Sequence, residues 1–253
     1  MNENWEKNSD EMESWQEAPY VSKFTSEVMK EMAAPDLASR VATKSFAIVF
    51  IGLIITTIAS YLTLSNVDFL YMLLSTNMFT FLLVAELVVV FINSWAIRKN
   101  NLVLAGVLYL VYSVSNGITM SVVFLAYDLG TVQEAFLMSA VIFGAMAAFG
   151  YFTKKDLSTV GAVCGMALLG VLLVTLLNTF VFHSSGLELV MDYVVILLFV
   201  GITAYDMYRM KQAVLEGGEE EENRIALFTG MQLYLDFINI FLRLIRILGR
   251  SKK

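Results

Sequence analysis

Long apolar runs alternate with short polar connections along most of the chain. Each run holds about twenty residues, which as an α-helix matches a hydrocarbon core about 30 Å thick. The pattern predicts seven membrane-spanning helices, near 45–66, 79–97, 103–127, 132–152, 159–182, 189–208 and 226–248. The predicted fold class is therefore an all-α membrane protein with seven transmembrane helices.

Composition agrees with a membrane protein, because 58% of the residues are hydrophobic and only 16% are charged, with a mean hydropathy of +0.69. The net charge of −6 arises largely outside the predicted helices. Residues 1–44 hold nine acidic and five basic residues and are predicted to form a flexible acidic cytoplasmic tail. Residues 45–253 are predicted to form the seven-helix domain. We expect no signal peptide, since the chain opens with acidic residues instead of an apolar segment.

Basic residues follow the second, fourth and sixth predicted helices: Arg98, Lys99, Lys154, Lys155, Arg209, Lys211 and Arg224. The alternate connections, 67–78, 128–131 and 183–188, contain neither lysine nor arginine. Because basic loops stay in the cytoplasm, this asymmetry places the N-terminus there. A seventh helix that crosses fully would put Arg250, Lys252 and Lys253 outside, against this rule. Either the rule yields at the last helix, or the last segment re-enters and returns.

Polar side chains within the predicted helices gather on one face of each helix. In the last helix they cover an arc about 100° wide, at 3.6 residues per turn: Thr229, Gln232, Asp236, Asn239, Arg243 and Arg246. Similar faces carry Asp192, Thr203 and Asp206 in the sixth helix, Glu86 and Asn93 in the second, and Tyr109, Tyr112, Asn116 and Thr119 in the third. A charge at the bilayer centre costs about 2.5–3.5 kcal/mol, so these faces should meet in the interior. From them we predict an ion pathway of Glu86, Asn93, Asn116, Asp192 and Asn239.

Asp206 and Asp236 lie on the last two predicted helices, which one connection joins, so their carboxyl groups can meet in the inner half of the membrane. Two carboxylates in a dry site cannot both ionise cheaply and therefore titrate as a unit. This arrangement predicts a proton-sensitive gate. The alternative is that a neighbouring arginine neutralises each carboxylate, Arg209 for Asp206 and Arg243 for Asp236.

Four stretches carry a resemblance to a known family: "LYLDFINIFLRLIRILG" (233–249), "TAYDMYRMKQ" (203–212), "SNGITMSVVF" (115–124) and "FGYFTKKDLS" (149–158). Their order and spacing resemble the Bax inhibitor-1 (TMBIM) family from about residue 40 to the end. The resemblance implies that the last helix is central and surrounded by the other six. It also implies a pH-sensitive calcium leak gated by Asp206 and Asp236, which would bind Ca²⁺ transiently, with Glu86 in the ion path.

The sequence departs from the family pattern at one position. Bacterial members place an arginine eleven residues after the second-helix glutamate, where it latches the aspartate pair. Here that position holds Ile97, and the arginine follows as Arg98. The latch is therefore absent, shifted to Arg98, or supplied by Arg243.

We expect a passive cation pathway, chiefly for calcium. The alternatives are a non-conducting regulator of cell stress, cell death or membrane proteolysis that acts through protein partners, and a proton-coupled transporter, for which no inverted repeat is evident. Enzymatic activity is not expected, since the single Cys164 and single His183 offer neither a nucleophile–base pair nor a metal-ligand cluster. The expected partners are the lipid bilayer, Ca²⁺, protons and other membrane proteins, without a cofactor or nucleic acid. The expected location is a bacterial inner membrane, with an ER-type membrane second.

Overall fold

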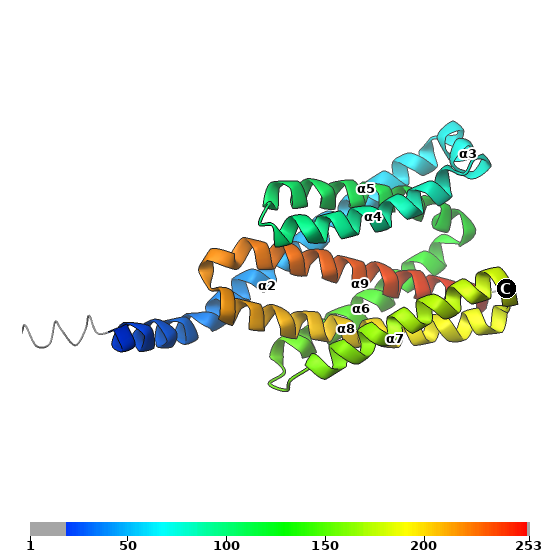
Figure 1. Cartoon of the computed structure of the whole chain (residues 1–253). Coiled ribbons are helices and arrows are strands. Elements are labelled where there is room, and N and C mark those ends of the chain that lie inside the picture. The colour runs from blue at the N-terminus through cyan, green and yellow to red at the C-terminus, as the bar shows by residue number, and fades with distance from the viewer. Residues whose placement is uncertain (1–18, 252–253) are drawn as a thin grey trace, which may run out of the picture.

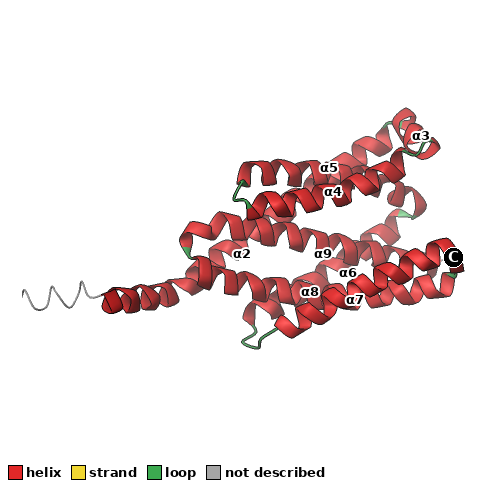
Figure 2. Ribbon diagram, in the orientation of Figure 1, coloured by secondary structure: helices red, strands yellow, loops and turns green. Residues whose placement is uncertain are grey.

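The computed structural model describes residues 19–251, with side chains for 34–178 and 180–250, and this part of the chain is built of helices and short turns (Figures 1 and 2). The helices are α2 (Pro19–Ser65), α3 (Val67–Ser75), α4 (Met78–Arg98), α5 (Leu102–Ala126), α6 (Leu129–Phe152), α7 (Ser158–Leu177), α8 (Ser185–Gly217) and α9 (Glu222–Ser251). A short π-helix, η1 (Asn178–Phe182), follows α7, and a 3₁₀ turn, η2 (Glu219–Glu221), precedes α9.

Seven segments of the described chain are long and apolar enough to cross a membrane, which confirms the predicted fold class. They are Ala34–Ser65, Met78–Arg98, Leu102–Ala126, Leu129–Phe152, Ser158–Phe182, Ser185–Gly217 and Glu219–Arg250. The last is a single continuous helix, so the re-entrant alternative is wrong. The connection between the last two predicted helices, residues 209–225, is also shorter than expected, because α8 continues to Gly217 and ends at Gly218, whose φ of 65° favours glycine.

Helix α9 is the most buried of the seven spans, with 67% of its most apolar stretch inside the protein, against 6% for α7. It packs mainly against α2, α8 and α6, and less extensively against α5 and α4. Helix α7 packs chiefly on α8, along one side of the bundle in Figure 1. The prediction that all six other helices surround the last one is therefore not confirmed.

Small residues allow the closest helix contacts. A Cβ atom at Gly150 of α6 would lie 2.1 Å from the carbonyl oxygen of Ala204 on α8. In the GxxxG pair of α7, Gly161 lies against the ring of Tyr205, whereas Gly165 faces open space. The pair thus contributes one close contact, between α7 and α8.

The N-terminal region differs from its prediction. Helix α2 begins at Pro19, so the boundary predicted at residue 44 falls inside a continuous helix. Leu37, Ala38 and Val41 are buried in the hydrophobic core, and residues 34–44 therefore belong to the bundle. Residues 1–18 of the predicted acidic tail lie outside the described residues.

The connection predicted over 67–78 contains the short helix α3. Asn66 caps this helix, because its side chain accepts a hydrogen bond from the backbone N–H of Phe69 at 3.0 Å. Asp68 lies in the first turn, where a negative charge is favourable. Both signals are visible in the sequence.

Charged residues join α2 to the turn between α8 and α9. Arg40 forms ion pairs with Asp36 at 2.6 Å and with Glu219 at 2.7 Å, and Lys44 pairs with Glu222 at 2.8 Å. The acidic run 219–222 therefore supplies two partners to α2. We call this side, where the basic connections lie, the basic end of the bundle.

Candidate ion pathway and gate

The polar faces of α8 and α9 lie against each other, as their placement on one side of each helix predicts. The side chains of Asp206 and Asp236 are almost fully buried, at 4% and 3% exposure. The charge of Asp206 acts on Asp236, and Thr203, one turn before Asp206, is a neighbour of Asp236 whose hydroxyl donates to the carbonyl oxygen of Phe199 at 2.7 Å. The Oδ2 atom of each aspartate is buried without a hydrogen-bond partner. We call Asp206 and Asp236 the aspartate pair.

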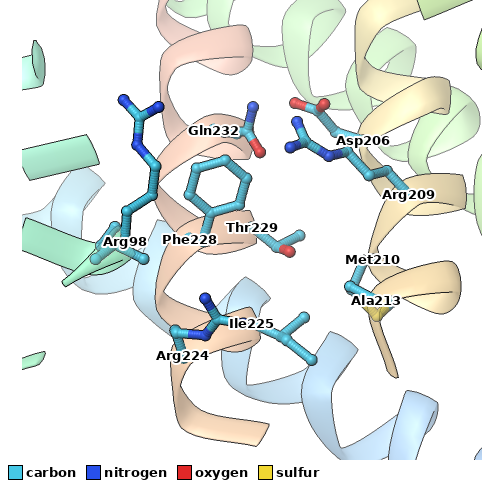
Figure 3. A pocket seen from close by; sticks show the side chains of 11 residues that line it. Arg98, Asp206, Arg209, Met210, Ala213, Arg224, Ile225, Phe228, Thr229 and Gln232 are labelled. Carbon is cyan, nitrogen blue, oxygen red and sulfur yellow. The ribbon is translucent and has the colours of Figure 1, made fainter. Parts of the chain in front are cut away.

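A pocket of 180 Å³ opens beside Asp206 at the basic end (Figure 3). Its polar lining comes from Arg98 of α4, Asp206 and Arg209 of α8, and Arg224, Thr229 and Gln232 of α9. Asp236 is not part of this lining. One member of the aspartate pair therefore lines the pocket, and the other does not.

The arginines of the pocket differ in how they are engaged. Arg224 forms an ion pair with Glu221. The guanidinium carbon of Arg209 lies 5.1 Å from the centre of the Phe228 ring, and its charge acts on Asp206. Within the described part of the chain, Arg209 and Asp206 form no ion pair closer than 4.0 Å. The predicted neutralisation of Asp206 by Arg209 is thus present as a longer-range interaction.

The two candidate latch residues, Arg98 and Arg243, lie at different ends of the bundle and have different partners. Arg98 lines the same pocket as Asp206, but its Nε donates to the carbonyl oxygen of Ser94 at 3.3 Å. Arg243 pairs with Asp192 at 3.0 Å, so the prediction that it neutralises or latches Asp236 is wrong. The physical reason is distance, since seven helical residues place Arg243 about 10 Å further along α9 than Asp236.

Arg243 belongs to an ion-pair cluster at the opposite end of the bundle. Asp192, which has no exposed surface, also pairs with Arg246 at 2.7 Å. Glu188 pairs with Arg246 at 3.6 Å and with Arg250. The acidic residues of α8 thus neutralise the basic residues near the end of α9. Of the three basic residues that oppose a fully crossing last helix, Arg250 is thus paired, whereas Lys252 and Lys253 lie outside the described residues.

Glu86 lies in a third polar cluster, between α4, α5 and α9. The hydroxyl of Thr119 donates to its Oε1 at 3.1 Å, and its charge acts on Tyr112 and Tyr234. Asn116 donates to the hydroxyl of Tyr112 at 3.3 Å. The structure therefore brings Glu86 and Asn116 together, but in a cluster separate from the aspartate pair.

The other predicted pathway residues bind backbone groups. Asn93 of α4 donates to the carbonyl oxygen of Ala105 at 3.1 Å and joins α4 to α5. Asn239 donates to the carbonyl oxygen of Leu235, within α9, at 2.8 Å. The side-chain oxygens of Asn93 and Asn116 are buried without a partner, so both retain an acceptor.

Three residues of these polar clusters, Tyr234, Thr56 and Thr203, were not predicted as site residues from the sequence. Tyr234 falls on the apolar face of α9, yet its hydroxyl lies 2.6 Å from the hydroxyl of Thr56 on α2. A buried tyrosine needs such a partner, but sequence alone does not show which helix supplies it. Thr203 shares a helix face with Asp206, so its place beside the aspartate pair could have been predicted from this spacing.

Comparisons with known proteins support the family resemblance that the four sequence stretches carry. The family model described as "Inhibitor of apoptosis-promoting Bax1" matches residues 38–253. The Inner membrane protein YbhL of Escherichia coli K12 is 33% identical over 210 residues, which cover 80% of this chain and 88% of the relative. A Deinococcus radiodurans protein is 37% identical over 203 residues (79% and 86%), and a Borreliella burgdorferi protein is 33% identical over 219 residues (85% and 94%). The chain is therefore an integral multi-pass membrane protein that belongs to the Bax inhibitor-1 family.

Proposed function

We propose that this protein is a pH-sensitive cation leak, chiefly for Ca²⁺, in which the aspartate pair is the gate. One observation carries the proposal: two buried carboxyl groups from adjacent helices interact with each other, and each retains an oxygen without a partner. Burial of an unsatisfied charged group is costly. The pair is therefore most stable when its carboxyl groups share a proton, and loss of that proton would drive the groups apart.

The same geometry supports a path for cations on the basic side of the gate. Asp206 lines the pocket of the basic end, so its separation from Asp236 would join the pocket to the bundle interior. Ca²⁺ prefers six to eight oxygen ligands. The two carboxylates, the hydroxyl of Thr203 and water could supply these ligands transiently.

The proposal includes an orientation and a location. We propose that the N-terminus and the basic end face the cytoplasm, since connections rich in lysine and arginine tend to stay on that side. The Escherichia coli relative is described as an inner membrane protein, and we propose a bacterial inner membrane for this chain. The gate would then open toward the cytoplasm.

Calcium flux into proteoliposomes, measured over a range of pH, tests this function. The wild-type protein should show a flux that changes with pH. The double variant Asp206→Asn with Asp236→Asn keeps the shape and hydrogen-bonding capacity of the pair but cannot titrate, so its flux should lose the pH dependence. Asp68→Asn, which neutralises an exposed acid of α3, is the matched control and should behave as wild type.

Two results would contradict the proposal. If the double asparagine variant keeps both the flux and its pH dependence, the aspartate pair is not the gate. If correctly folded wild-type protein conducts no cations at any pH, the non-conducting regulator is favoured instead.

A further inference from the structure

The pocket at the basic end carries more positive than negative charge. Three of its lining side chains are arginines, Arg98 of α4, Arg209 of α8 and Arg224 of α9, and one is an acid, Asp206. Figure 3 shows the three arginines on different helices around one space. Three positive groups against one negative group leave an excess of positive charge even when Asp206 is ionised. The aspartate pair explains the acid in this lining but not the arginines.

Each of the three guanidinium groups has donors to spare. A guanidinium carries five N–H donors in a rigid plane. Arg98 donates from its Nε to a backbone carbonyl oxygen of α4, and Arg224 donates from its Nε to Glu221. Arg209 stacks on the ring of Phe228 and donates no hydrogen bond within the described part of the chain. The terminal nitrogens of all three groups are therefore available to a ligand in the pocket.

Two uncharged donors line the same pocket. Thr229 of α9 is only 3% exposed, yet its hydroxyl is not occluded and points into the space between α8 and α9 in Figure 3. Helical threonines often bond a carbonyl four residues earlier, as Thr57 does to Leu53 at 2.8 Å. Among the described residues, neither the Thr229 hydroxyl nor the amide of Gln232, one turn further on, has a hydrogen-bond partner. Both can donate to an acceptor in the pocket.

This set of donors suits a phosphate group. Guanidinium groups bind phosphate and carboxylate oxygens through paired N–H donors. Arginines from three helices approach from different directions, which matches a tetrahedral anion with acceptors on every side better than a planar carboxylate. The pocket volume of 180 Å³ is several times the roughly 30 Å³ that one water occupies in the liquid. A phosphate group and bound water therefore both have room.

We propose that the pocket at the basic end binds one phosphate group. Arg98 and Arg209 supply charged donors, and Thr229 and Gln232 supply uncharged ones. Asp206 is the one lining group that opposes an anion, and the arginines outweigh its charge. A soluble phosphate and the headgroup of an anionic phospholipid share this chemistry. The inference does not depend on the cation leak, because binding is measured without flux.

Equilibrium binding of radiolabelled inorganic phosphate to the full-length protein in phosphatidylcholine nanodiscs tests the site. Binding to the wild type should be saturable and should persist in a large excess of chloride. Arg98→Gln and Arg209→Gln should each weaken it by about tenfold, the effect of a hydrogen bond to a charged group. Thr229→Val should weaken it by about three- to tenfold. Lys99→Gln is the matched control and should bind as wild type, because Lys99 is exposed beside Arg98 but does not line the pocket.

Native mass spectrometry distinguishes a lipid headgroup from soluble phosphate. The protein is released from nanodiscs of phosphatidylglycerol or phosphatidylcholine, and the retained lipids are counted. If the headgroup is the ligand, the wild type and Lys99→Gln should retain one more phosphatidylglycerol than Arg209→Gln, with no such difference for phosphatidylcholine. If soluble phosphate is the ligand, all variants should retain the same lipids and only phosphate binding should change.

The inference is overturned if the arginine variants change neither phosphate binding nor phosphatidylglycerol retention. It is also overturned if Lys99→Gln lowers binding as much as Arg209→Gln, which would indicate diffuse surface charge. Displacement of phosphate by chloride would have the same meaning. The arginine side chains replaced are exposed, so these variants should fold. Should one fail to fold, chloride competition in the wild-type protein still decides.

Discussion

Arg243 of α9 donates a hydrogen bond to the carboxylate of Asp192 on α8, over 3.0 Å. The contact α8–α9 thus has two chemically different ends. At one end acidic and basic side chains neutralise each other, and at the other end two buried acids, Asp206 and Asp236, influence each other electrostatically. The first arrangement joins the two helices by ion pairs, whereas the second is the gate of the proposed function.

Removal of the acidic partner at the opposite end should destabilise the bundle. Asp192→Asn leaves Arg243 and Arg246 without their carboxylate, and loss of one partner of a buried ion pair costs about 3–5 kcal/mol. Glu188→Gln is the control, because Glu188 is 44% exposed and exposed pairs contribute roughly 0–1 kcal/mol. Thermal unfolding in detergent should rank the variants in this order. Equal melting temperatures would contradict the structural role of the buried cluster.

Close packing of α6 on α8 predicts a second difference in stability. Gly150→Ala places a Cβ atom against the carbonyl oxygen of Ala204, and such overpacking costs about 1–3 kcal/mol. Gly144→Ala is a matched control on the same helix, because nothing lies within 4 Å of its added Cβ. Gly144→Ala should be neutral or slightly stabilising, since alanine has the higher helix propensity. Unfolding measurements that find both variants alike would show that the two helices can separate without cost.

The pocket at the basic end predicts a role for Arg98 in the gate. Arg98→Gln removes a positive charge near Asp206 and should move the midpoint of the flux–pH curve to higher pH by roughly one unit or less, because the ionised pair loses a stabilising charge. Arg224→Gln is the control, since Arg224 lines the same pocket but is paired with Glu221. If Arg98→Gln leaves the midpoint unchanged, this arginine does not act on the pair.

The orientation predicts which turns a reagent can reach from outside. In a Cys164→Ala background, His183→Cys at the opposite end should react with a membrane-impermeant maleimide in intact cells. Asn100→Cys at the basic end should react only after permeabilisation. Both positions are exposed turns with φ near 50°. The reverse pattern would place the N-terminus outside.

Helix number and the inward direction of the polar faces could be predicted from the sequence, because both follow from periodicity along single helices. Asp192, Asp206 and Asp236 are buried, as expected for charged groups that cannot face lipid. That Asp206 and Asp236 lie on helices packed against each other also follows from sequence, since one turn joins these helices.

Contacts between distant helices could not be predicted in the same way. The pairing of Arg243 with Asp192 depends on the axial offset of α8 and α9, which the predicted helix ends at residues 208 and 226 did not define. The bond between Thr56 and Tyr234 depends on α2 lying beside α9. The boundary at residue 44 was misplaced because amphipathic residues such as Arg40 and Lys44 pair with the α8–α9 turn instead of remaining solvated.

The separation of the Asp206 and Asp236 carboxyl groups, measured in experimental structures in lipid at one acidic and one alkaline pH, tests the central claim most directly. We predict that the acidic form holds the two groups within hydrogen-bonding reach or bridged by one water, at oxygen distances of about 2.5–3.0 Å per bond, and that the alkaline form holds them further apart. Carboxyl groups that point to different sides of the bundle at both pH values, beyond the reach of a bridging water, would contradict the account.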